Sequence, residues 1–332
     1  MRLTWLVALA AAAGALTSVS QAAEWRVQRI DTPARVMAIE TVDGKSRVNA
    51  GGLWYAVTFA DGKIKLAFVD VPAKTDPPQG ALPDGRIAVG RRDIARAWLA
   101  EPTTRYAHDI FGSKVAAGSL LIVTRDGRLH TVRLKDDAVF EDLAPRLADL
   151  DGDGHDEIVV VKSYLNRGSS LAVIALRKGK YEIVAETPPI GRPHAWLNPA
   201  GIADFNGDGK TDIALVHMPH AAGTLELWSW ANQRLNKTSE LAGTANHVAG
   251  THALDMAATA DFDGDGVADL AVPSFERDRL RIVAFKPAAH EIASVALPAK
   301  AVTNIALVTG GAGPPMIAAG LSDGSLVVLR KD

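Results

Sequence analysis

Short apolar runs alternate with polar turns along most of the chain, in the pattern of paired antiparallel β-strands. Six such pairs are LWYAVTFADGKIKLAFVD, SLLIVTRDGRLHTVRL, SLAVIALRKGKYEIVAE, TLELWSWANQRLNKTSE, RLRIVAFKPAAHEIASVAL and MIAAGLSDGSLVVLR. Each pair has the length of two strands, and in most pairs the turn contains Gly or Asn, which is typical of β-hairpins. Because the pairs recur along the chain, the pattern predicts a repeat protein of the all-β class with six units.

An acidic loop is written three times between the apolar runs of the middle units. The copies are ADLDGDGHDEI from Ala148, ADFNGDGKTDI from Ala203 and ADFDGDGVADL from Ala260. Their first aspartates, Asp149, Asp204 and Asp261, are 55 and then 57 residues apart, which is roughly the size of one four-stranded sheet with its turns. Each middle unit therefore reads as strand, acidic loop, strand, loop, strand, turn, strand, which predicts one blade of a β-propeller.

The spacing within each copy places oxygen-bearing side chains at alternate positions, while glycines let the backbone curl around a centre. The candidate ligands are Asp149, Asp151, Asp153 and Glu157 in the first copy, Asp204, Asn206, Asp208 and Asp212 in the second, and Asp261, Asp263, Asp265 and Asp269 in the third, with the carbonyl groups of His155, Lys210 and Val267 between them. An all-oxygen set of this size suits Ca²⁺ better than Mg²⁺, which needs a stricter octahedron. We expect three structural calcium ions.

A turn without metal and an EF-hand both compete with this interpretation of the loops. Asp-Gly pairs are frequent in hairpin turns that hold no metal, but clustered carboxylates repel one another unless a positive charge lies between them. A bare turn therefore accounts poorly for three acidic copies. An EF-hand loop opens in the same way, but it needs a Glu at its twelfth position and a helix on each side. That position holds Val160, Leu215 and Val272, inside apolar runs, so the EF-hand interpretation fails.

The three loops and their flanking strands resemble the FG-GAP and VCBS type repeats, which are the calcium-loop blades of integrin-like and bacterial extracellular β-propellers. The resemblance covers about Leu147 to Leu297. It implies a propeller with calcium bound between the first two strands of a blade. It implies no single activity, because such propellers serve adhesion, carbohydrate handling and scaffolding. One departure is Glu157, which is longer than the Asp of the other copies.

The last unit predicts how the ring closes. After Val302 to Val308, the stretch TGGAGPP replaces the acidic loop, two more strands follow, and the chain stops before a fourth. Because a bare sheet edge invites aggregation, we expect Glu24 to Asp31 to supply the missing strand. An unattached N-terminal strand is the alternative, and seven blades are the alternative to six, since the first two units are divergent. The stretch Val71 to Gly90 is interpreted as a surface loop between the first two blades.

Composition and the chain ends set the predicted context. Residues 1–22 have a basic start, an apolar core and a small-residue exit, which predicts a secretory signal peptide cleaved after Ala22 or Ala23. The chain has no cysteine and a net charge of −2, so neither disulfides nor a lipid-attached cysteine is available. A basic footprint for nucleic acid or anionic membranes is also missing. We expect residues 23–332 to form one propeller domain, monomeric and periplasmic or secreted, without membrane insertion.

Topology predicts a second surface at the end of the blades opposite the acidic loops. The candidate ligand face there comprises Arg192, His194, Trp196, His217, His220 and His252. These residues either bind a polar ligand or a partner, or they fill a channel mouth and satisfy loop backbone groups. A transition metal held by His217, His220 and another histidine is a further hypothesis.

No catalytic motif stands out in the sequence, and the acidic pairs belong to the predicted calcium loops. The leading hypothesis is a secreted binding or scaffolding module for a protein or glycan. The alternative is a carbohydrate-active enzyme, similar to polysaccharide lyases, that uses the opposite face.

Overall fold

The structure is a computed structural model that describes residues 24–70, 78–308, 310 and 313–331. The predicted signal peptide, residues 1–22, lies outside these residues. All regular secondary structure in the described ranges is β, as predicted, and all strand pairs are antiparallel. Consequently, no part of the described chain forms a helix suited to cross a membrane.

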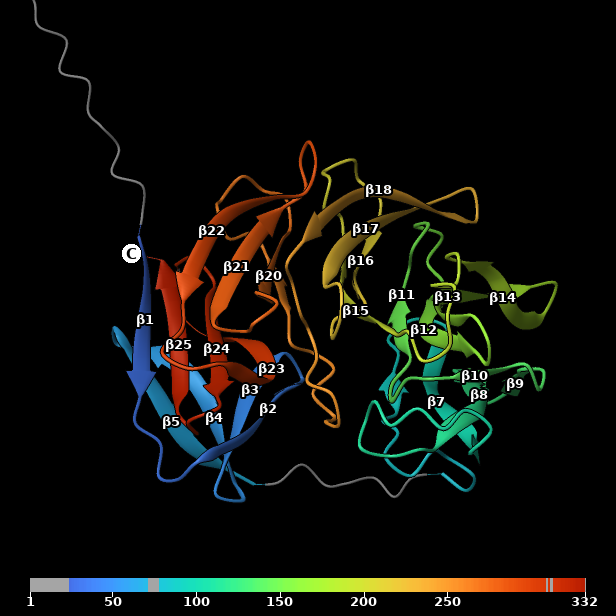
Figure 1. The fold of residues 1–332 in the computed structure, drawn as a ribbon, viewed down its shortest axis with the longest axis horizontal. Coiled ribbons are helices and arrows are strands. Elements are labelled where there is room, and N and C mark those ends of the chain that lie inside the picture. Colours follow the sequence, from blue (N-terminus) through green and yellow to red (C-terminus); the bar gives the residue numbers. More distant parts are fainter. Residues whose placement is uncertain (1–23, 71–77, 309, 311–312, 332) are drawn as a thin grey trace, which may run out of the picture.

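The strands form four-stranded sheets and one larger sheet (Figure 1). The first sheet holds β2 (Val36–Val42), β3 (Lys45–Ala50), β4 (Leu53–Ala60) and β5 (Lys63–Val69). The larger sheet holds β6 (Ala88–Val89), β7 (Ile94–Thr103), β8 (Ala116–Thr124), β9 (Leu129–Arg133), β10 (Ala138–Phe140), β11 (Arg146–Ala148), β12 (Glu157–Tyr164), β13 (Gly168–Arg177) and β14 (Lys180–Glu186). Two more sheets hold β15 (Leu197–Ala203), β16 (Asp212–His217), β17 (Thr224–Ala231) and β18 (Arg234–Ala242), and β19 (Ala258–Ala260), β20 (Asp269–Pro273), β21 (Arg279–Ala284) and β22 (His290–Ala296). The last sheet holds β23 (Ala301–Val308), β24 (Met316–Leu321), β25 (Leu326–Lys331) and β1 (Trp25–Ile30).

The nine-stranded sheet consists of two four-stranded ladders, β6–β9 and β11–β14, which the short strand β10 joins. Phe140 in β10 pairs with Ala117 of β8 on one side and with Lys162 of β12 on the other. The structure also corrects the interpretation of Val71 to Gly90 as a loop, because β6 lies within this stretch and pairs with β7. A two-residue strand is too short to leave an alternating pattern in the sequence.

The N-terminal strand pairs with the C-terminal strand, which confirms the predicted pairing. β1 runs antiparallel to β25, from Trp25 opposite Lys331 to Ile30 opposite Leu326. Figure 1 shows the two strands side by side, in blue and red. The last sheet therefore reaches four strands only with residues from both ends of the chain.

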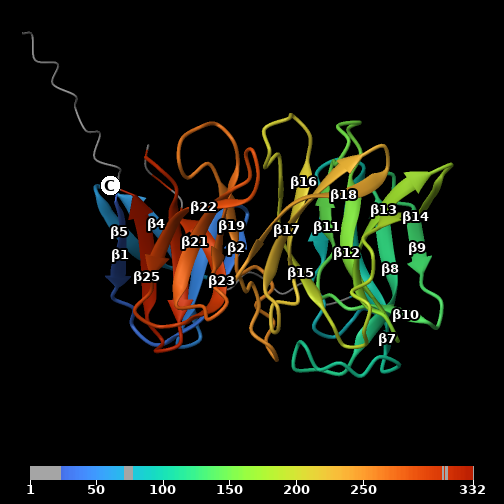
Figure 2. The ribbon, with the colours of Figure 1, turned by 45° about the horizontal axis from the view of Figure 1, so that its top comes forward.

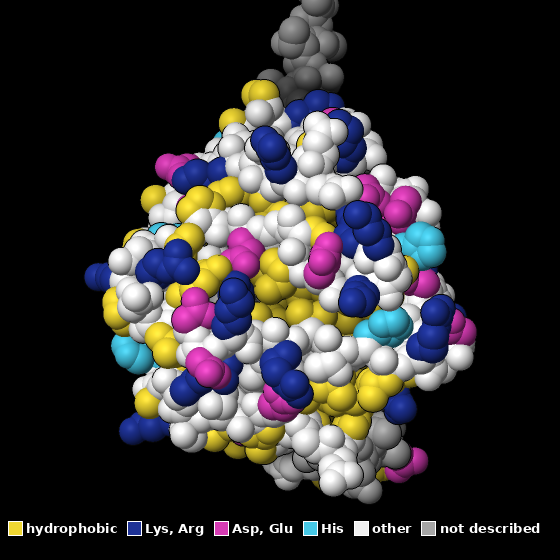
Figure 3. Space-filling model, turned by 90° about the vertical axis from the view of Figure 1, so that its right-hand side faces the viewer, with side chains coloured by type: hydrophobic (Ala, Val, Ile, Leu, Met, Phe, Trp, Pro, Cys, Tyr) yellow, Lys and Arg dark blue, Asp and Glu magenta, His cyan; other side chains and the backbone are white. Residues whose placement is uncertain are grey.

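Neighbouring sheets share buried apolar side chains. Phe205 and Phe285 pack 5.1 Å apart between the β15–β18 and β19–β22 sheets, and Ile30, Val36 and Val328 belong to one cluster between the first and last sheets. Figure 2 shows the strands running in similar directions, with loops at both ends. On the side that carries β9 and β14, side chains of both charge signs intermingle (Figure 3). The arrangement is propeller-like.

Candidate functional site

Each acidic loop connects the first two strands of a four-stranded ladder. The loops lie between β11 and β12, between β15 and β16, and between β19 and β20. This is the position that the repeat pattern predicts. The three loops also lie in consecutive ladders along the chain, so the same end of each ladder carries the same acidic pattern.

The first aspartate of each loop orders the loop backbone. The Asp149 carboxylate accepts hydrogen bonds from Gly152 at 2.7 Å and from Gly154 at 3.1 Å. Both glycines have positive φ, +77° and +88°, a conformation that other residues rarely adopt. The equivalent bonds are Gly207 and Gly209 to Asp204, both 2.8 Å, and Gly264 and Gly266 to Asp261, 2.6 and 2.9 Å. The three loops therefore have one conformation.

The last acidic residue of each loop is buried beneath it. Glu157 accepts a hydrogen bond from the Leu150 backbone at 2.9 Å, and Asp269 accepts the equivalent bond from Phe262 at 2.9 Å. Asp212 accepts the equivalent bond from the Phe205 backbone at 3.3 Å. The longer Glu157 thus occupies the place of the shorter aspartates, and its difference in length leaves this contact intact.

Burial and crowding keep these carboxyl groups from ionising easily. Desolvation first, and then the nearby loop aspartates, raise the pKa of Glu157 to about 7. The same causes raise the pKa of Asp269 to about 6, and burial raises the pKa of Asp212. Raised pKa values of this kind mean that the ionised form of each group is disfavoured in its surroundings. A bound cation would reverse these shifts.

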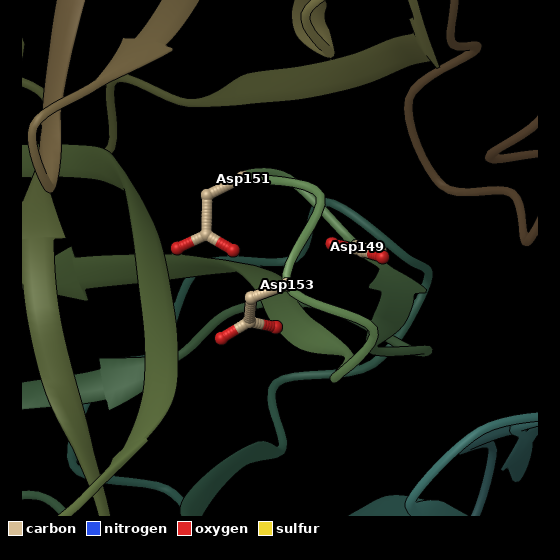
Figure 4. A group of neighbouring side chains, drawn as sticks. All are labelled: Asp149, Asp151 and Asp153. Atoms are coloured by element: carbon tan, nitrogen blue, oxygen red, sulfur yellow. The ribbon is translucent and has the colours of Figure 1, made fainter.

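Carboxylate oxygens within the first loop, and within the third loop, lie close together. Oxygen atoms of Asp149, Asp151 and Asp153 all lie within 4.8 Å of one another, and so do those of the equivalent residues in the third loop. The latter are Asp261, Asp263 and Asp265. Figure 4 shows the Asp151 and Asp153 carboxylates on one side of the first loop, with Asp149 across it. The donor set is oxygen only, so it fits Ca²⁺.

The second loop has a neutral residue at one of the predicted ligand positions. Asn206 takes the place of Asp151, and its Oδ1 accepts a hydrogen bond from the Asp208 backbone at 2.9 Å. In all three loops the residue at the predicted carbonyl position donates its N–H to the preceding aspartate, at 2.8 to 2.9 Å. These residues are His155, Lys210 and Val267. Their roles as carbonyl ligands stay predictions.

The loops also contact one another. The Thr211 hydroxyl in the second loop donates to the Asp149 carbonyl in the first loop at 3.2 Å. A Cβ added to Gly207 would lie 3.0 Å from the Val267 side chain of the third loop, so the second and third loops are close neighbours. The three loops form a continuous row along one end of the molecule.

Each end of this row contacts a neighbouring ladder. Arg92, before β7, lies with its Nε 3.6 Å from Asp149 Oδ2. At the other end, Lys331 of β25 donates to the Phe262 carbonyl at 3.3 Å, and Trp25 of β1 packs edge-on against the Phe262 ring at 5.9 Å. The acidic loops are therefore linked to the sheet that both chain termini complete.

The predicted ligand face lies at the opposite end of the strands. Ala203 pairs with Asp212 beside the second acidic loop, whereas Leu197 pairs with His217 at the far end of the same strand pair. A pocket of about 320 Å³ opens near that end. Its lining residues are His108, Asp109, Ile110, Arg192, His194, Ala195, Trp196, Met218, His220, Ala221 and Ala249.

The pocket gathers four of the six predicted face residues. Arg192, His194, Trp196 and His220 line it together. His217 and His252 are not among its lining residues; the His252 carbonyl instead accepts a hydrogen bond from Arg86, at 2.6 Å. Within the described ranges, the groups of three metal-ligating residues that converge are the two carboxylate sets, and His217 and His220 belong to neither, so the transition-metal site stays a hypothesis.

His194 is held in an unusual backbone conformation. Its φ is +56°, its N–H donates to the Tyr106 hydroxyl at 2.7 Å, and its ring stacks on Tyr106 at 4.9 Å. Gly168 permits the turn to approach, because a Cβ there would lie 2.4 Å from the Arg192 carbonyl. Left-handed residues held in this way are frequent at functional sites.

His108 and His220 also line the pocket, and each contacts a buried side chain. His108 Nδ1 lies 2.6 Å from Oε1 of the buried Glu141, which also accepts a hydrogen bond from Ser163. His247 lies behind His220, with its Nδ1 3.1 Å from His220 Nε2 and its Nε2 3.0 Å from the Thr251 carbonyl. Since a carbonyl only accepts, His247 Nε2 carries the proton and its Nδ1 accepts from His220.

Sequence reasoning missed Tyr106, His108 and Glu141. They belong to the divergent second unit and the segment after it, which lack the acidic pattern. The available signal was weak: two ring-bearing residues close together in the stretch RYAHD, between predicted strands. The partner Glu141 stands in a separate part of the chain, so only the fold brings the pair together.

Comparison with known proteins bears on the acidic loops. The sequence profile of the FG-GAP-like repeat matches residues 149–215 and 204–272. No curated protein matched the chain. Among solved structures, rhamnogalacturonan lyase YesW has a TM-score of 0.44 and 15% sequence identity, covering 92% of this chain and 62% of the lyase chain. Over these residues the chain is similar to FG-GAP-like repeats, and the matches fall on the acidic loops and their strands.

Proposed function

We propose that this protein is a β-propeller that is stabilised by bound calcium and acts as a binding module. The observation that carries the proposal is the triple acidic loop, because three copies share one conformation and each ends on a buried carboxyl group. The loop carboxylates would hold Ca²⁺, and the ion would supply the positive charge that the loops lack. The opposite end would remain free to bind a ligand or partner.

Six blades in a ring are part of the proposal. Counting the nine-stranded sheet as two ladders gives six four-stranded units, and β1 completes the last of them. A cavity of about 340 Å³ supports a central channel, since its lining comes from the first sheet, the last sheet and two residues outside the strands. Its residues are Glu40, Thr41, Arg86, Asp255, Asn304 and Ile305. Arg86 and Asp255 form an ion pair at 3.1 Å across it.

We also propose that the mature chain works outside the cytosol, as a monomer, without binding nucleic acid or inserting into a membrane. The predicted signal peptide and the net charge of −2 support this setting. Calcium is plentiful in such compartments, so occupancy of the loops would be the normal condition of the folded protein.

Thermal melting of an Asp151→Asn variant tests whether calcium bound to the acidic loops stabilises the fold. With saturating calcium, loss of a charged ligand should lower the melting temperature relative to the unmodified chain. With a chelator, the same change removes one repelling charge, so stability should be equal or higher. Asp84→Asn, on an exposed residue away from the loops, is the matched control. An Asp151→Asn variant that melts like this control in both buffers would contradict stabilisation by bound calcium.

A second candidate function is an acid–base enzyme that acts on carbohydrate in the pocket lined by His108, Arg192 and His194. The His108–Glu141 pair favours it, because a buried carboxylate fixes the imidazole and leaves Nε2 as the nitrogen available to a substrate. Incubation with uronate-containing polysaccharides should then produce unsaturated sugar ends, detected by ultraviolet absorbance. The His108→Gln variant should lose the product. Binding without product would leave the module as the function.

A further inference from the structure

The pocket at the end opposite the acidic loops combines an apolar floor with a basic rim. Ile110 and Trp196 are 5% and 2% exposed and form part of the floor, beside Met218. The side chains of Arg192 and His194 belong to exposed residues at the rim. A volume of about 320 Å³ is enough for one ring with its substituents.

Arg192 is the permanent positive charge of this pocket. Its Nη2 lies 3.4 Å from Met218 Sδ, so the guanidinium is held beside the floor. Among the lining residues Asp109 carries the one carboxylate, and it is exposed. Glu141 is bonded to His108 and Ser163 and does not line the pocket. A single planar cation therefore dominates the recognition of a charged ligand.

The set of polar groups distinguishes between ligand classes. A neutral sugar needs several acceptors and donors for its hydroxyl groups. The lining residues offer one carboxylate, one guanidinium and three imidazoles, and two of the imidazole nitrogens, His108 Nδ1 and His220 Nε2, already have protein partners. An apolar floor would leave such hydroxyls without partners, which costs binding free energy. A planar guanidinium matches a carboxylate through two parallel hydrogen bonds, whereas a doubly charged phosphate would call for more cations.

We propose that the pocket binds a small organic carboxylate with an apolar ring as its body. The carboxylate lies at Arg192, and the ring lies on the half-buried Met218 beside His220, whose own ring stacks on the buried Trp196. His108 borders the ring, with its Nδ1 committed to Glu141. This inference rests on the proposed function, because it takes this end of the propeller as the ligand face.

Calorimetric titration of the calcium-loaded mature protein tests the inference with simple probes. Benzoate should bind, and benzyl alcohol, which keeps the ring without the charge, should bind about tenfold more weakly or not at all. The variant Arg192→Gln should reduce benzoate affinity to the level of the alcohol. Arg234→Gln is the matched control, because Arg234 is exposed on β18 and does not line the pocket.

A second pair of variants tests the same pocket without changing Arg192. Ala249 is exposed and lines the pocket, so Ala249→Asp should repel benzoate while Ala249→Ser keeps its binding. Equal affinity for benzoate and benzyl alcohol would overturn the inference, and so would preferred binding of glucose or of inorganic phosphate. Calcium-dependent melting of the same samples reports the proposed function separately. A protein that melts as proposed and ignores benzoate contradicts this inference alone.

Discussion

The first aspartate of each acidic loop has two effects. Its carboxylate orders the loop backbone, and it also adds negative charge to the loop. These residues are Asp149, Asp204 and Asp261. Each accepts two backbone hydrogen bonds from glycines in its own loop. Hydrogen bonds to a charged group are worth about 1.5–3 kcal/mol each, so the loop conformation is favoured even before an ion binds. A preformed loop would lose little conformational freedom on binding the proposed Ca²⁺, and this would strengthen the site.

A different residue, His247, makes stability depend on pH. Burial first, and then the charge of His220, lower the pKa of His247 to about 3, whereas an unfolded histidine has a pKa of about 6.5. Between these values the unfolded chain binds the proton more readily, so stability rises with pH across this window. Acidification from pH 7 to pH 5 should cost about 2 kcal/mol from this group.

Denaturant unfolding at pH 7 and pH 5, in saturating calcium, measures this effect. The variant His247→Asn removes the titrating ring, so its stability should change less between the two pH values than that of the unmodified chain. His290→Asn is the control, because His290 is an exposed histidine on β22. An identical pH response in all three proteins would contradict a buried neutral His247.

At the scale of elements, β1 has two structural roles. It supplies the fourth strand of the last sheet, and its Trp25 contacts Phe262 of the third acidic loop. Lys331, opposite Trp25 in β25, donates to the carbonyl of the same phenylalanine. The β1–β25 pair and the third acidic loop are therefore in direct contact, so order in one favours order in the other.

Removal of β1 tests this arrangement. A mature chain that begins at Thr32 leaves the edge of β25 unpaired, and exposed strand edges promote association. We expect a lower melting temperature and oligomers or aggregates in light scattering, compared with a chain that begins at Glu24. A shortened chain that stays monomeric and keeps its melting temperature would show that β1 does not close the sheet.

At the scale of the whole molecule, the sequence predicts features that repeat and misses features that do not. The acidic loops and strand pairs recur with fixed spacing, and β1 follows from a missing fourth strand. The pocket has no such signal. His108, His194 and His220 come from three separate loops, and only the packing of ladders against one another brings them to one cavity. Strand β10 escapes prediction for a related reason, since its pairing depends on two ladders meeting.

Calorimetric titration of the chelator-stripped mature protein with calcium tests the central claim most directly. Three loops of one conformation predict uptake of three ions per chain, accompanied by a rise in the melting temperature. If the titration showed no heat of binding and the melting temperature did not respond to calcium, the acidic loops would be turns without an ion and the account would be wrong.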